Sequence, residues 1–288
     1  MRSPSNPPEH SADVALVRQP DDLDAALSIG FRGAVTLEDE PNAGPTKHGM
    51  RRIVRLPSKF EYLADGDVLG LHAGTKRFRT LYRRASEHNS ILVTERCNHY
   101  CLMCSQPPRD IADSWILDEI EKALPLLDTQ TRSLGFTGGE PLLEWRKFLA
   151  VLTQCRDLLP QTAIHVLSNG RAFASKEITG AWADLRHPDL MVGIPVYAEV
   201  DNIHDYVVQA TGAFNETILG ILRLKDKGQR VEVRVVLHAL TAPRIVATCK
   251  WHARNLPFVD HVALMGLENT GFAIANDDLL WIDPMDYR

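Results

Sequence analysis

Hydrophobic positions along the chain change their rhythm near residue 90. From there, short apolar runs alternate with longer segments in which apolar residues recur every three or four positions, as in an amphipathic helix. This alternation predicts a parallel sheet with helical crossovers. The expected strands cover residues 91–94, 133–137, 163–168, 190–196, 230–237 and 260–266, and the expected helices cover residues 113–128, 144–159, 215–227 and 243–255.

The number of strand–helix units indicates which α/β architecture this part of the chain adopts. A complete eight-unit barrel takes about 250 residues. The alternating pattern occupies only residues 90–288 of the chain. Its six strands therefore predict an α/β fold with a partial (β/α)6 TIM-like barrel of parallel strands.

The first part of the chain has a different pattern. A polar, Pro-rich tail is followed by an expected helical patch at residues 12–30, and residues 31–84 combine short apolar runs with Gly and Pro. We therefore expect two domains. Residues 1–85 form a small β-rich lead-in domain that acts as a cap or recognises a peptide, and residues 86–288 form the barrel.

Composition and charge exclude several classes of protein. A hydrophobic share of 44%, a charged share of 24% and a net charge of -5 are typical of a globular chain rather than a disordered one. No apolar run approaches the roughly 18 residues that cross a bilayer, and the start MRSPSNPPEH lacks the apolar region of a secretory signal. The mild acidity argues against nucleic-acid binding. We expect a cytoplasmic protein with neither a membrane nor a nucleic-acid partner.

Three of the five cysteines, Cys97, Cys101 and Cys104, lie within the eight residues CNHYCLMC after the first expected strand. Thiolates are soft ligands that select zinc or iron–sulfur clusters. A structural zinc site normally takes four ligands, often as two Cys-x2-Cys pairs, and this chain has no second pair. A [4Fe–4S] cluster usually takes four cysteines, so three leave one iron open to a substrate or cofactor. The spacing favours an iron–sulfur cluster, with zinc or a buried thiol cluster as alternatives.

Polar motifs follow the later strands as well. Gly138-Gly139-Glu140 follow the second strand, Ser168-Asn169-Gly170 the third and His204-Asp205 the fourth. With the cysteines, these motifs make the chain from about Ser90 to Arg288 resemble the radical S-adenosylmethionine (radical SAM) superfamily. More narrowly, the stretches HNSILVTERCNHYCLMCSQPPRD, GFTGGEPLL, VVQATGAF and ALMGLENTGFA are similar to the His-Xaa-Ser system radical SAM maturase family.

The resemblance implies a definite chemistry. It implies a [4Fe–4S] cluster on Cys97, Cys101 and Cys104 that cleaves S-adenosylmethionine to a 5′-deoxyadenosyl radical, which abstracts hydrogen from a C–H bond. The implied substrate is a ribosomally synthesised peptide of the His-Xaa-Ser type. The implied partners are an electron donor such as a flavodoxin or ferredoxin and a second maturase, and no catalytic residue beyond the cluster ligands is expected. A radical SAM enzyme acting on a small molecule or nucleoside, and a non-catalytic iron–sulfur or zinc protein acting as a maturase partner, stay open as alternatives.

The resemblance also implies a set of cofactor-binding residues. Gly138 and Gly139 let the backbone approach a ligand, and Glu140 offers a carboxylate to the amino group of the cofactor. The alternative for these three residues is a simple strand-to-helix turn with an acidic first-turn residue. The expected cofactor-binding residues are Met103, Gly138, Gly139, Glu140, Ser168, Asn169, Arg234 and Met265.

The other candidates have structural alternatives, and for Ser168 and Asn169 the alternative is the turn that Asn-Gly commonly forms. Arg234 lies mid-strand, where it binds the ribose or carboxylate of the cofactor or forms an ion pair. Met103 stands where many relatives carry an aromatic residue. Met265 resembles the family position whose backbone contacts adenine, and the alternative for Met265 is packing in the core. His204 and Asp205 are expected at the start of a helix, with Asp205 as its cap.

Some positions depart from the family pattern. Ala198 and Val208 stand where many peptide-modifying relatives carry a serine and an arginine, so ribose recognition is expected to use Tyr197 or Gln209. No cysteine follows Cys249, so auxiliary clusters are not expected. The family usually continues beyond the point where this chain stops, and we therefore expect a short C-terminus.

Overall fold

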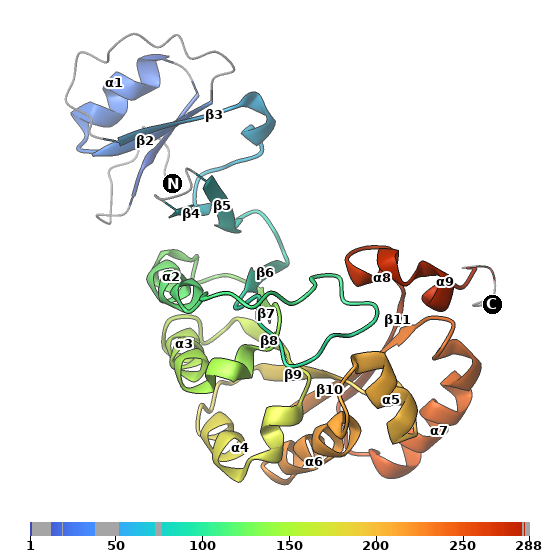
Figure 1. Cartoon of the computed structure of the whole chain (residues 1–288). Coiled ribbons are helices and arrows are strands. Elements are labelled where there is room, and N and C mark those ends of the chain that lie inside the picture. Colours follow the sequence, from blue (N-terminus) through green and yellow to red (C-terminus); the bar gives the residue numbers. More distant parts are fainter. Residues whose placement is uncertain (2–12, 19, 38–51, 73–76, 284, 286–288) are drawn as a thin grey trace. The chain divides into compact units, whose positions relative to one another are not determined.

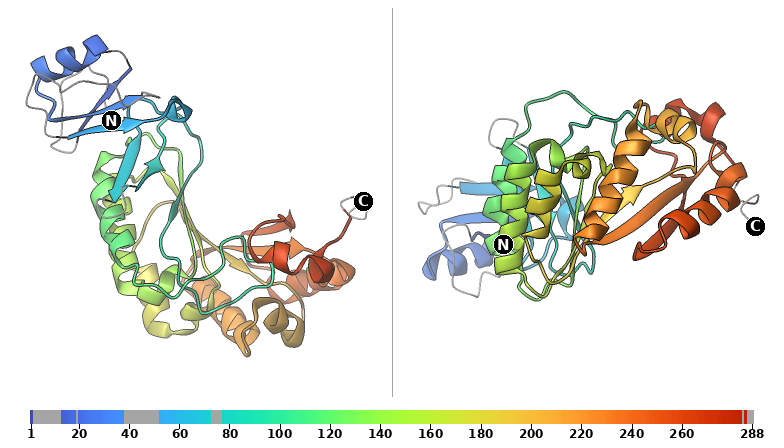
Figure 2. Two further views of the ribbon diagram at one scale, coloured as in Figure 1. Left: turned by 45° about the horizontal axis from the view of Figure 1, so that its top comes forward. Right: turned by 90° about the horizontal axis from the view of Figure 1, so that it is seen from below.

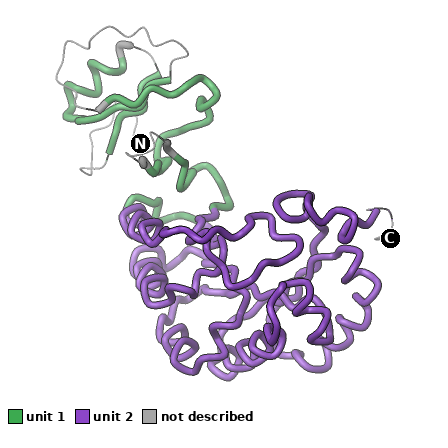
Figure 3. The backbone as a smooth tube through the Cα atoms, viewed as in Figure 1, with its two compact units in different colours: residues 1–89, 126–131 green, residues 90–125, 132–288 purple. Residues whose placement is uncertain are grey.

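The computed structural model of the chain describes residues 1, 13–18, 20–37, 52–72, 77–283 and 285 (Figure 1). Residues 1–89 with 126–131 form one unit, and residues 90–125 with 132–288 form a second (Figure 3). The expected N-terminal tail, at residues 2–12, lies outside the described residues. Among the helices that the structure describes, none has both the length and the apolar character needed to span a bilayer.

The described residues of unit 1 form two small sheets and one α-helix. Strands β1 (Ala15–Val17), β2 (Gly33–Leu37) and β3 (Arg52–Leu56) pair in parallel in the order β1-β2-β3, and α1 (Pro20–Ser28) connects the first two. After the short 3-10 helix η1 (Ser58–Phe60), strands β4 (Val68–His72) and β5 (Arg77–Tyr82) pair antiparallel. The prediction of a small β-rich N-terminal part is confirmed.

The helical patch expected at residues 12–30 is wrong in its first half. Ala15, Leu16 and Val17 are all buried and form β1. A run of consecutive buried apolar residues is typical of a strand that is covered on both faces. The helix begins only at Pro20, where the fixed φ of proline suits the first helical position.

In the described part of unit 2, six strands form one parallel sheet in the order β11-β10-β9-β8-β7-β6 (Figure 1). The strands are β6 (Asn89–Leu92), β7 (Ser133–Thr137), β8 (Ala163–Leu167), β9 (Leu190–Pro195), β10 (Arg230–Leu237) and β11 (His261–Gly266). The printed registers pair β7 with β8, β8 with β9, β9 with β10 and β10 with β11 in parallel. The predicted partial (β/α)6 barrel is confirmed, and β7 and β10 have the bounds expected from the sequence.

Helices follow the strands and pack along the outer face of the curved sheet (Figures 1 and 2). The longer ones are α2 (Trp115–Ala123), α3 (Trp145–Leu158), α4 (Lys176–Ala183), α6 (Ala213–Asp226) and α7 (Ile245–Asn255). The shorter ones are α5 (Asp201–Val208), α8 (Phe272–Ala275), α9 (Asp277–Leu280) and the 3-10 turns η2 (Leu124–Leu126), η3 (Pro141–Glu144), η4 (Arg171–Ala174) and η5 (Ala242–Arg244). Consecutive outer helices contact one another, which gives the sheet a continuous layer.

The alternation of side chains along the strands decides which face the helices cover. In β10, Val231, Val233 and Val235 are fully buried, whereas the intervening Glu232 and Arg234 are half-buried. Successive side chains of a strand point to opposite faces, so the valines pack beneath the helices and the charged residues face inward. The helix expected at residues 113–128 ends at Ala123, because Pro125 has no N–H to continue it and the chain turns into η2.

Candidate functional site

The three clustered cysteines lie on the loop that leaves β6, at the edge where all the parallel strands end. Cys97, Cys101 and Cys104 are half-buried free thiols. The backbone N–H of His99 donates to Cys97 Sγ at 3.4 Å, and Cys104 Sγ donates to the carbonyl oxygen of Gln106 at 3.0 Å. Burial raises the pKa of all three thiols, that of Cys97 to about 11. The thiols therefore keep their protons at neutral pH and release them when they bind a metal.

The geometry of these thiols bears on the kind of metal group that they fit. Across the residues that the structure describes, no three Cys, His, Asp or Glu side chains converge closely enough to hold one metal ion. The ionisation of Cys101 is nevertheless affected by both Cys104 and Cys97, so the three thiols are electrostatic neighbours. A four-iron cluster binds each thiolate at a different iron, so its ligands lie further apart than those of one zinc ion. Three soft donors on one loop fit such a cluster.

Two backbone hydrogen bonds join the beginning of this cysteine loop (residues 94–104) to the end of β7. The N–H of Gly139 donates to the carbonyl oxygen of Thr94, and that of Glu140 to the carbonyl oxygen of Arg96, both at 2.8 Å. A Cβ on Gly139 would lie 1.9 Å from the Arg96 oxygen, and one on Gly138, whose φ is +135°, would lie 2.4 Å from the Thr94 oxygen. In this structure the two glycines allow the cysteine loop to lie close to the end of β7. Their close approach to a ligand stays a prediction.

A buried carboxylate, that of Asp113, holds the beginning of the cysteine loop. Asp113 is 1% exposed and accepts hydrogen bonds from Thr94 Oγ1 at 2.8 Å, Glu95 N at 2.6 Å and Arg96 Nε at 2.9 Å. Arg96 also forms an ion pair with Glu144 of η3. Although burial opposes ionisation, these hydrogen bonds keep the pKa of Asp113 below its usual value. The sequence pattern missed this network, because an acidic residue before a helix ordinarily indicates only a helix start.

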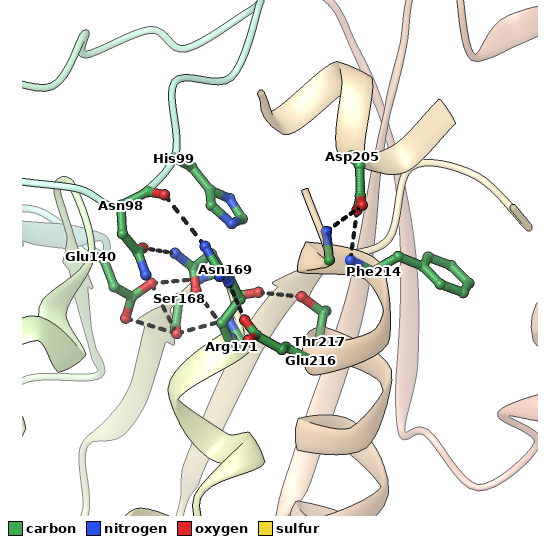
Figure 4. Close-up of polar contacts among 12 residues, drawn as sticks. Asn98, His99, Glu140, Ser168, Asn169, Arg171, Asp205, Phe214, Glu216 and Thr217 are labelled. Atoms are coloured by element: carbon green, nitrogen blue, oxygen red, sulfur yellow. Dashed lines mark hydrogen bonds and ion pairs between the residues drawn. The ribbon is translucent and has the colours of Figure 1, made fainter. Parts of the chain in front are cut away.

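Glu140 connects the ends of β7 and β8 (Figure 4). It is 1% exposed, and its carboxylate accepts from Ser168 Oγ at 2.9 Å, Asn169 N at 2.7 Å and Leu142 N at 3.0 Å. Burial raises its pKa. The structure thus brings together Glu140, Ser168 and Asn169, as expected for one site. Their polar atoms bind one another, and the expected contact with a cofactor amine stays a prediction.

The loop after β8 contacts the cysteine loop beside its first cysteine (Figure 4). Asn169 Nδ2 donates to Asn98 Oδ1 at 2.6 Å, and Arg171 Nη1 donates to the Asn98 carbonyl oxygen at 3.5 Å. Arg171 is itself held by an ion pair with Glu216, and Thr217 Oγ1 donates to the Asn169 carbonyl oxygen at 3.0 Å. Asn98 and Arg171 were missed in the sequence. The available signal was the position of Asn98 inside the cysteine motif.

Helix α5 supports the middle of the cysteine loop. The backbone N–H of Tyr100 donates to the carbonyl oxygen of Val208 at 3.1 Å, and that of Leu102 donates to Val207 at 2.9 Å. These are carbonyl groups of the last helical turn, which have no partner within the helix. The loop therefore completes the hydrogen bonding of the helix end.

The expected role of Asp205 needs a correction. Asp205 does not start a helix but lies in the middle of α5, and it caps the next helix, α6. Its carboxylate accepts from Gly212 N at 2.6 Å and Phe214 N at 2.8 Å (Figure 4). The neighbouring His204 is fully buried, stacks on the Tyr197 ring with centroids 5.7 Å apart, and accepts from Tyr197 N through Nδ1 at 3.2 Å. Burial lowers the pKa of His204 to about 4, so its ring is neutral.

The remaining candidates fall into two places. Met103 is buried beside Tyr197 in an apolar cluster that also packs against Cys101. Arg234 and Met265 lie on the inner faces of β10 and β11, where Arg234 Nη2 donates to Met265 Sδ at 2.9 Å. Arg234 also pairs with Glu232 at 2.8 Å, which is the ion-pair alternative considered for it.

The two departures from the family pattern lie in a buried environment. Ala198 and Val208 are fully buried. Gln209 is exposed at the end of α5 with φ +55°, and its side chain donates to the carbonyl oxygen of Tyr206. The use of Tyr197 or Gln209 in ribose recognition stays a prediction.

The segment after β11 closes the other side of the cysteine loop. Phe272 N donates to the carbonyl oxygen of Cys104 at 2.9 Å, and Asn276 Nδ2 donates to that of Leu102 at 2.8 Å. A Cβ on Gly271 would lie 2.2 Å from the Cys104 oxygen. The cysteine loop is thus held by segments that follow β7, β8, β9 and β11.

Comparisons with known proteins agree with this geometry. The family model of the Radical SAM superfamily matches residues 91–251. The crystal structure of Streptococcus suis SuiB bound to S-adenosylmethionine is similar over 66% of this chain and 42% of that chain, at 13% identity and a TM-score of 0.50. SuiB bound to precursor peptide SuiA is similar over 65% of this chain and 40% of that chain, at 12% identity and a TM-score of 0.50.

Native anSMEcpe with bound AdoMet is similar over 62% of this chain and 51% of that chain, at 15% identity and a TM-score of 0.49. The chain spans about two fifths of the length of the SuiB structures, and at such identities the similarity shows the fold alone. The comparison with curated protein sequences gives no significant match.

Proposed function

The chain belongs to the Radical SAM superfamily, and on that premise we propose that it is a radical SAM enzyme that modifies a ribosomally synthesised peptide. The observation that carries the proposal is the loop with Cys97, Cys101 and Cys104 at the carboxyl edge of a six-stranded parallel sheet. Active sites of parallel α/β folds lie at this edge.

Two further observations favour a peptide as the substrate. A solved structure with this fold, SuiB, is described with a precursor peptide bound. Four sequence stretches, among them the cysteine motif, are similar to the His-Xaa-Ser system maturases. We therefore propose a precursor of the His-Xaa-Ser type as the substrate, a flavodoxin or ferredoxin as electron donor, and unit 1 as a cap or as the part that recognises the precursor.

In this proposal the three cysteines would hold a [4Fe–4S] cluster, which with S-adenosylmethionine would supply a 5′-deoxyadenosyl radical for hydrogen abstraction from a C–H bond. The surrounding residues orient and shield the cluster ligands. Asp113 and Arg96 fix the beginning of the cysteine loop, and Asn169 fixes the position next to the first cysteine. Met103 and Tyr197 pack against Cys101 from the apolar side and exclude water there.

The test is anaerobic reconstitution with iron and sulfide, followed by reduction with and without S-adenosylmethionine. Electron paramagnetic resonance would report the cluster, and chromatography would measure 5′-deoxyadenosine. Cys101→Ala is expected to lose the cluster signal and the product. The matched control is Cys249→Ala, because Cys249 is also half-buried but lies on α7, away from the motif.

Each outcome bears on a different part of the proposal. A cluster signal that changes on addition of the cofactor, with 5′-deoxyadenosine made by wild type and Cys249→Ala alone, supports it. A tightly bound zinc ion in place of iron contradicts it. A reduced cluster that never cleaves the cofactor also contradicts it and favours a non-catalytic maturase partner.

A further inference from the structure

The inner face of the sheet in unit 2 carries small and polar side chains. The interior of a closed barrel is usually filled by layers of large branched residues. Here the inward positions of β7 and the first of β8 are half-buried and small; they are Ser133, Gly135, Thr137 and Ala163. The fully buried apolar residues of these strands point the other way, towards the helices, whereas Leu167 at the end of β8 points inward beside Gly193. Along β7 and the first part of β8, the inner face is therefore only partly buried and is not filled by large apolar side chains.

Three titratable side chains gather on this inner face. Arg234 Nη1 and Glu232 Oε1, both from β10, are 2.8 Å apart, and His165 Nε2 from β8 lies 3.6 Å from the same carboxylate oxygen. They meet across β9 because residue 193 is a glycine. A Cβ there would lie 3.0 Å from both Arg234 Cδ and His165 Nε2. The exposed fractions of the side chains of His165, Glu232 and Arg234 are 33%, 13% and 23%, so all three are reachable.

The hydrogen-bonding capacity of this group can be read from its contacts. His165 Nε2 is buried and makes no hydrogen bond; its nearest acceptor is Glu232 Oε1, 3.6 Å away. We therefore assign the ring proton to Nε2, which leaves Nδ1 as an acceptor. Burial, with Arg234 and His261 in the same sense and Glu232 opposing, lowers the pKa of His165 and keeps the ring neutral. Arg234 uses two donors, on Glu232 and Met265, out of the five of a guanidinium group.

The group is complementary to an amide. The charges of Glu232 and Arg234 cancel, so this surface is complementary to a ligand group without net charge. It presents an acceptor, His165 Nδ1, beside the donors of Arg234. A peptide or carboxamide group offers one N–H and one C=O in the same arrangement.

We propose that His165, Glu232 and Arg234 form a substrate subsite on the inner face of the sheet that binds an amide group of the peptide substrate. The amide N–H binds His165 Nδ1 and its C=O binds Arg234, while Glu232 is a positioning residue that orients both side chains. The inference rests on the proposed function and moves Arg234 from cofactor binding to substrate binding.

The first experiment measures coupling, the amount of modified peptide formed per 5′-deoxyadenosine. The probe is a synthetic peptide of repeated His-Ala-Ser units with blocked termini. His165→Phe and Arg234→Leu are each expected to raise KM for the peptide about tenfold and to lower coupling, because each removes one hydrogen bond to the amide. Arg230→Gln is the matched control, since Arg230 is on the same strand but pairs with Asp189 at the opposite end. Its KM is expected to equal that of wild type.

A second probe separates the two hydrogen bonds. Replacing one amide of the peptide by an ester removes its N–H and keeps its C=O. Wild type is expected to prefer the amide about tenfold, and His165→Phe is expected to lose this preference while Arg234→Leu keeps it. Equal preference in wild type and His165→Phe at every ester position would overturn the assignment.

A binding readout keeps the inference testable without turnover. The ring signal of His165 in the reconstituted protein, identified in the spectrum by its loss in His165→Phe, is expected to shift when the peptide is added. No shift at saturating peptide overturns the inference. Weaker binding of S-adenosylmethionine to Arg234→Leu, with an unchanged KM for the peptide, would place Arg234 on the cofactor and leave the proposed function standing. Absence of 5′-deoxyadenosine from wild type defeats the proposed function, and the peptide shift then still decides the subsite.

Discussion

A methyl group at residue 139 is expected to break the contact between the cysteine loop and β7. In Gly139→Ala the new Cβ would lie 1.9 Å from the carbonyl oxygen of Arg96 and 2.5 Å from its carbonyl carbon. Both atoms belong to the backbone, so no side chain can rotate to make room. The two segments must therefore separate by roughly 1 Å.

The cost follows from what this separation breaks. It lengthens the bonds from Gly139 to Thr94 and from Glu140 to Arg96 beyond hydrogen-bonding range, each bond contributing about 1 kcal/mol. Residual overpacking adds about 1–3 kcal/mol. We expect Gly139→Ala to lower the free energy of unfolding by about 3–5 kcal/mol, a large fraction of the roughly 5–15 kcal/mol of a typical domain.

The assay is urea denaturation of the purified chain, followed by circular dichroism. The matched control is Gly180→Ala in α4, where an added Cβ meets nothing within 4 Å. The control is expected to be stabilised by about 0.5–1 kcal/mol, the usual gain from alanine in a helix. Because Cys97 directly follows Arg96, the iron bound per chain after reconstitution should also fall in Gly139→Ala alone. A stability within 1 kcal/mol of wild type would refute the reasoning.

Three further predictions concern buried or half-buried polar groups. Asp113→Asn removes the charge that pairs with Arg96. Because Arg96 is 30% exposed, we expect the free energy of unfolding in urea to fall by about 2 kcal/mol. The control is Glu177→Gln, which removes one member of an exposed ion pair and should cost no more than about 0.5 kcal/mol. Asp205→Ala removes both hydrogen bonds that cap the N-terminus of α6 and should lower the free energy of unfolding by about 1–2 kcal/mol. Amide exchange should become faster only in the first turn of α6, and unchanged exchange there would contradict the capping role. His204 has a folded pKa of about 4 against an unfolded value near 6.5, so the unfolded chain binds the extra proton and stability falls as pH drops through this window. Between pH 7 and pH 5, wild type should lose about 2 kcal/mol more than His204→Gln, and parallel pH profiles would rule out His204 as the cause.

The sheet of unit 2 was predictable because one repeated physical rule governs it. Each strand between β7 and β10 alternates apolar residues that pack under a helix with residues that face inward, and this alternation is written directly in the sequence. The cysteine motif was identified from its close spacing alone, and its use as a set of soft ligands stays a prediction. Local pattern therefore predicted the strands and the motif.

The supports of the cysteine loop were not predictable, because their partners are distant in the sequence. Asn98 meets Asn169 and Arg171 only after β6 and β8 are placed in the same sheet. Asp205 shows the same limit, since its position predicted a local cap and the structure uses it for the following helix. The sequence pattern indicates that a polar residue needs a partner, and the tertiary fold decides which partner it takes.

The bond from Asn276 to Leu102 joins residues that are 174 positions apart in the chain. During synthesis, the ribosome releases the cysteine loop long before residues 271–276, which complete its hydrogen bonds through Phe272 and Asn276. Contacts of such sequence separation form late, because closing a long segment costs entropy before the contact repays it. We therefore expect this side of the cysteine loop to stay accessible until residues 271–276 have been synthesised. Under the proposed function, cluster insertion is then expected to precede the docking of this segment on the loop.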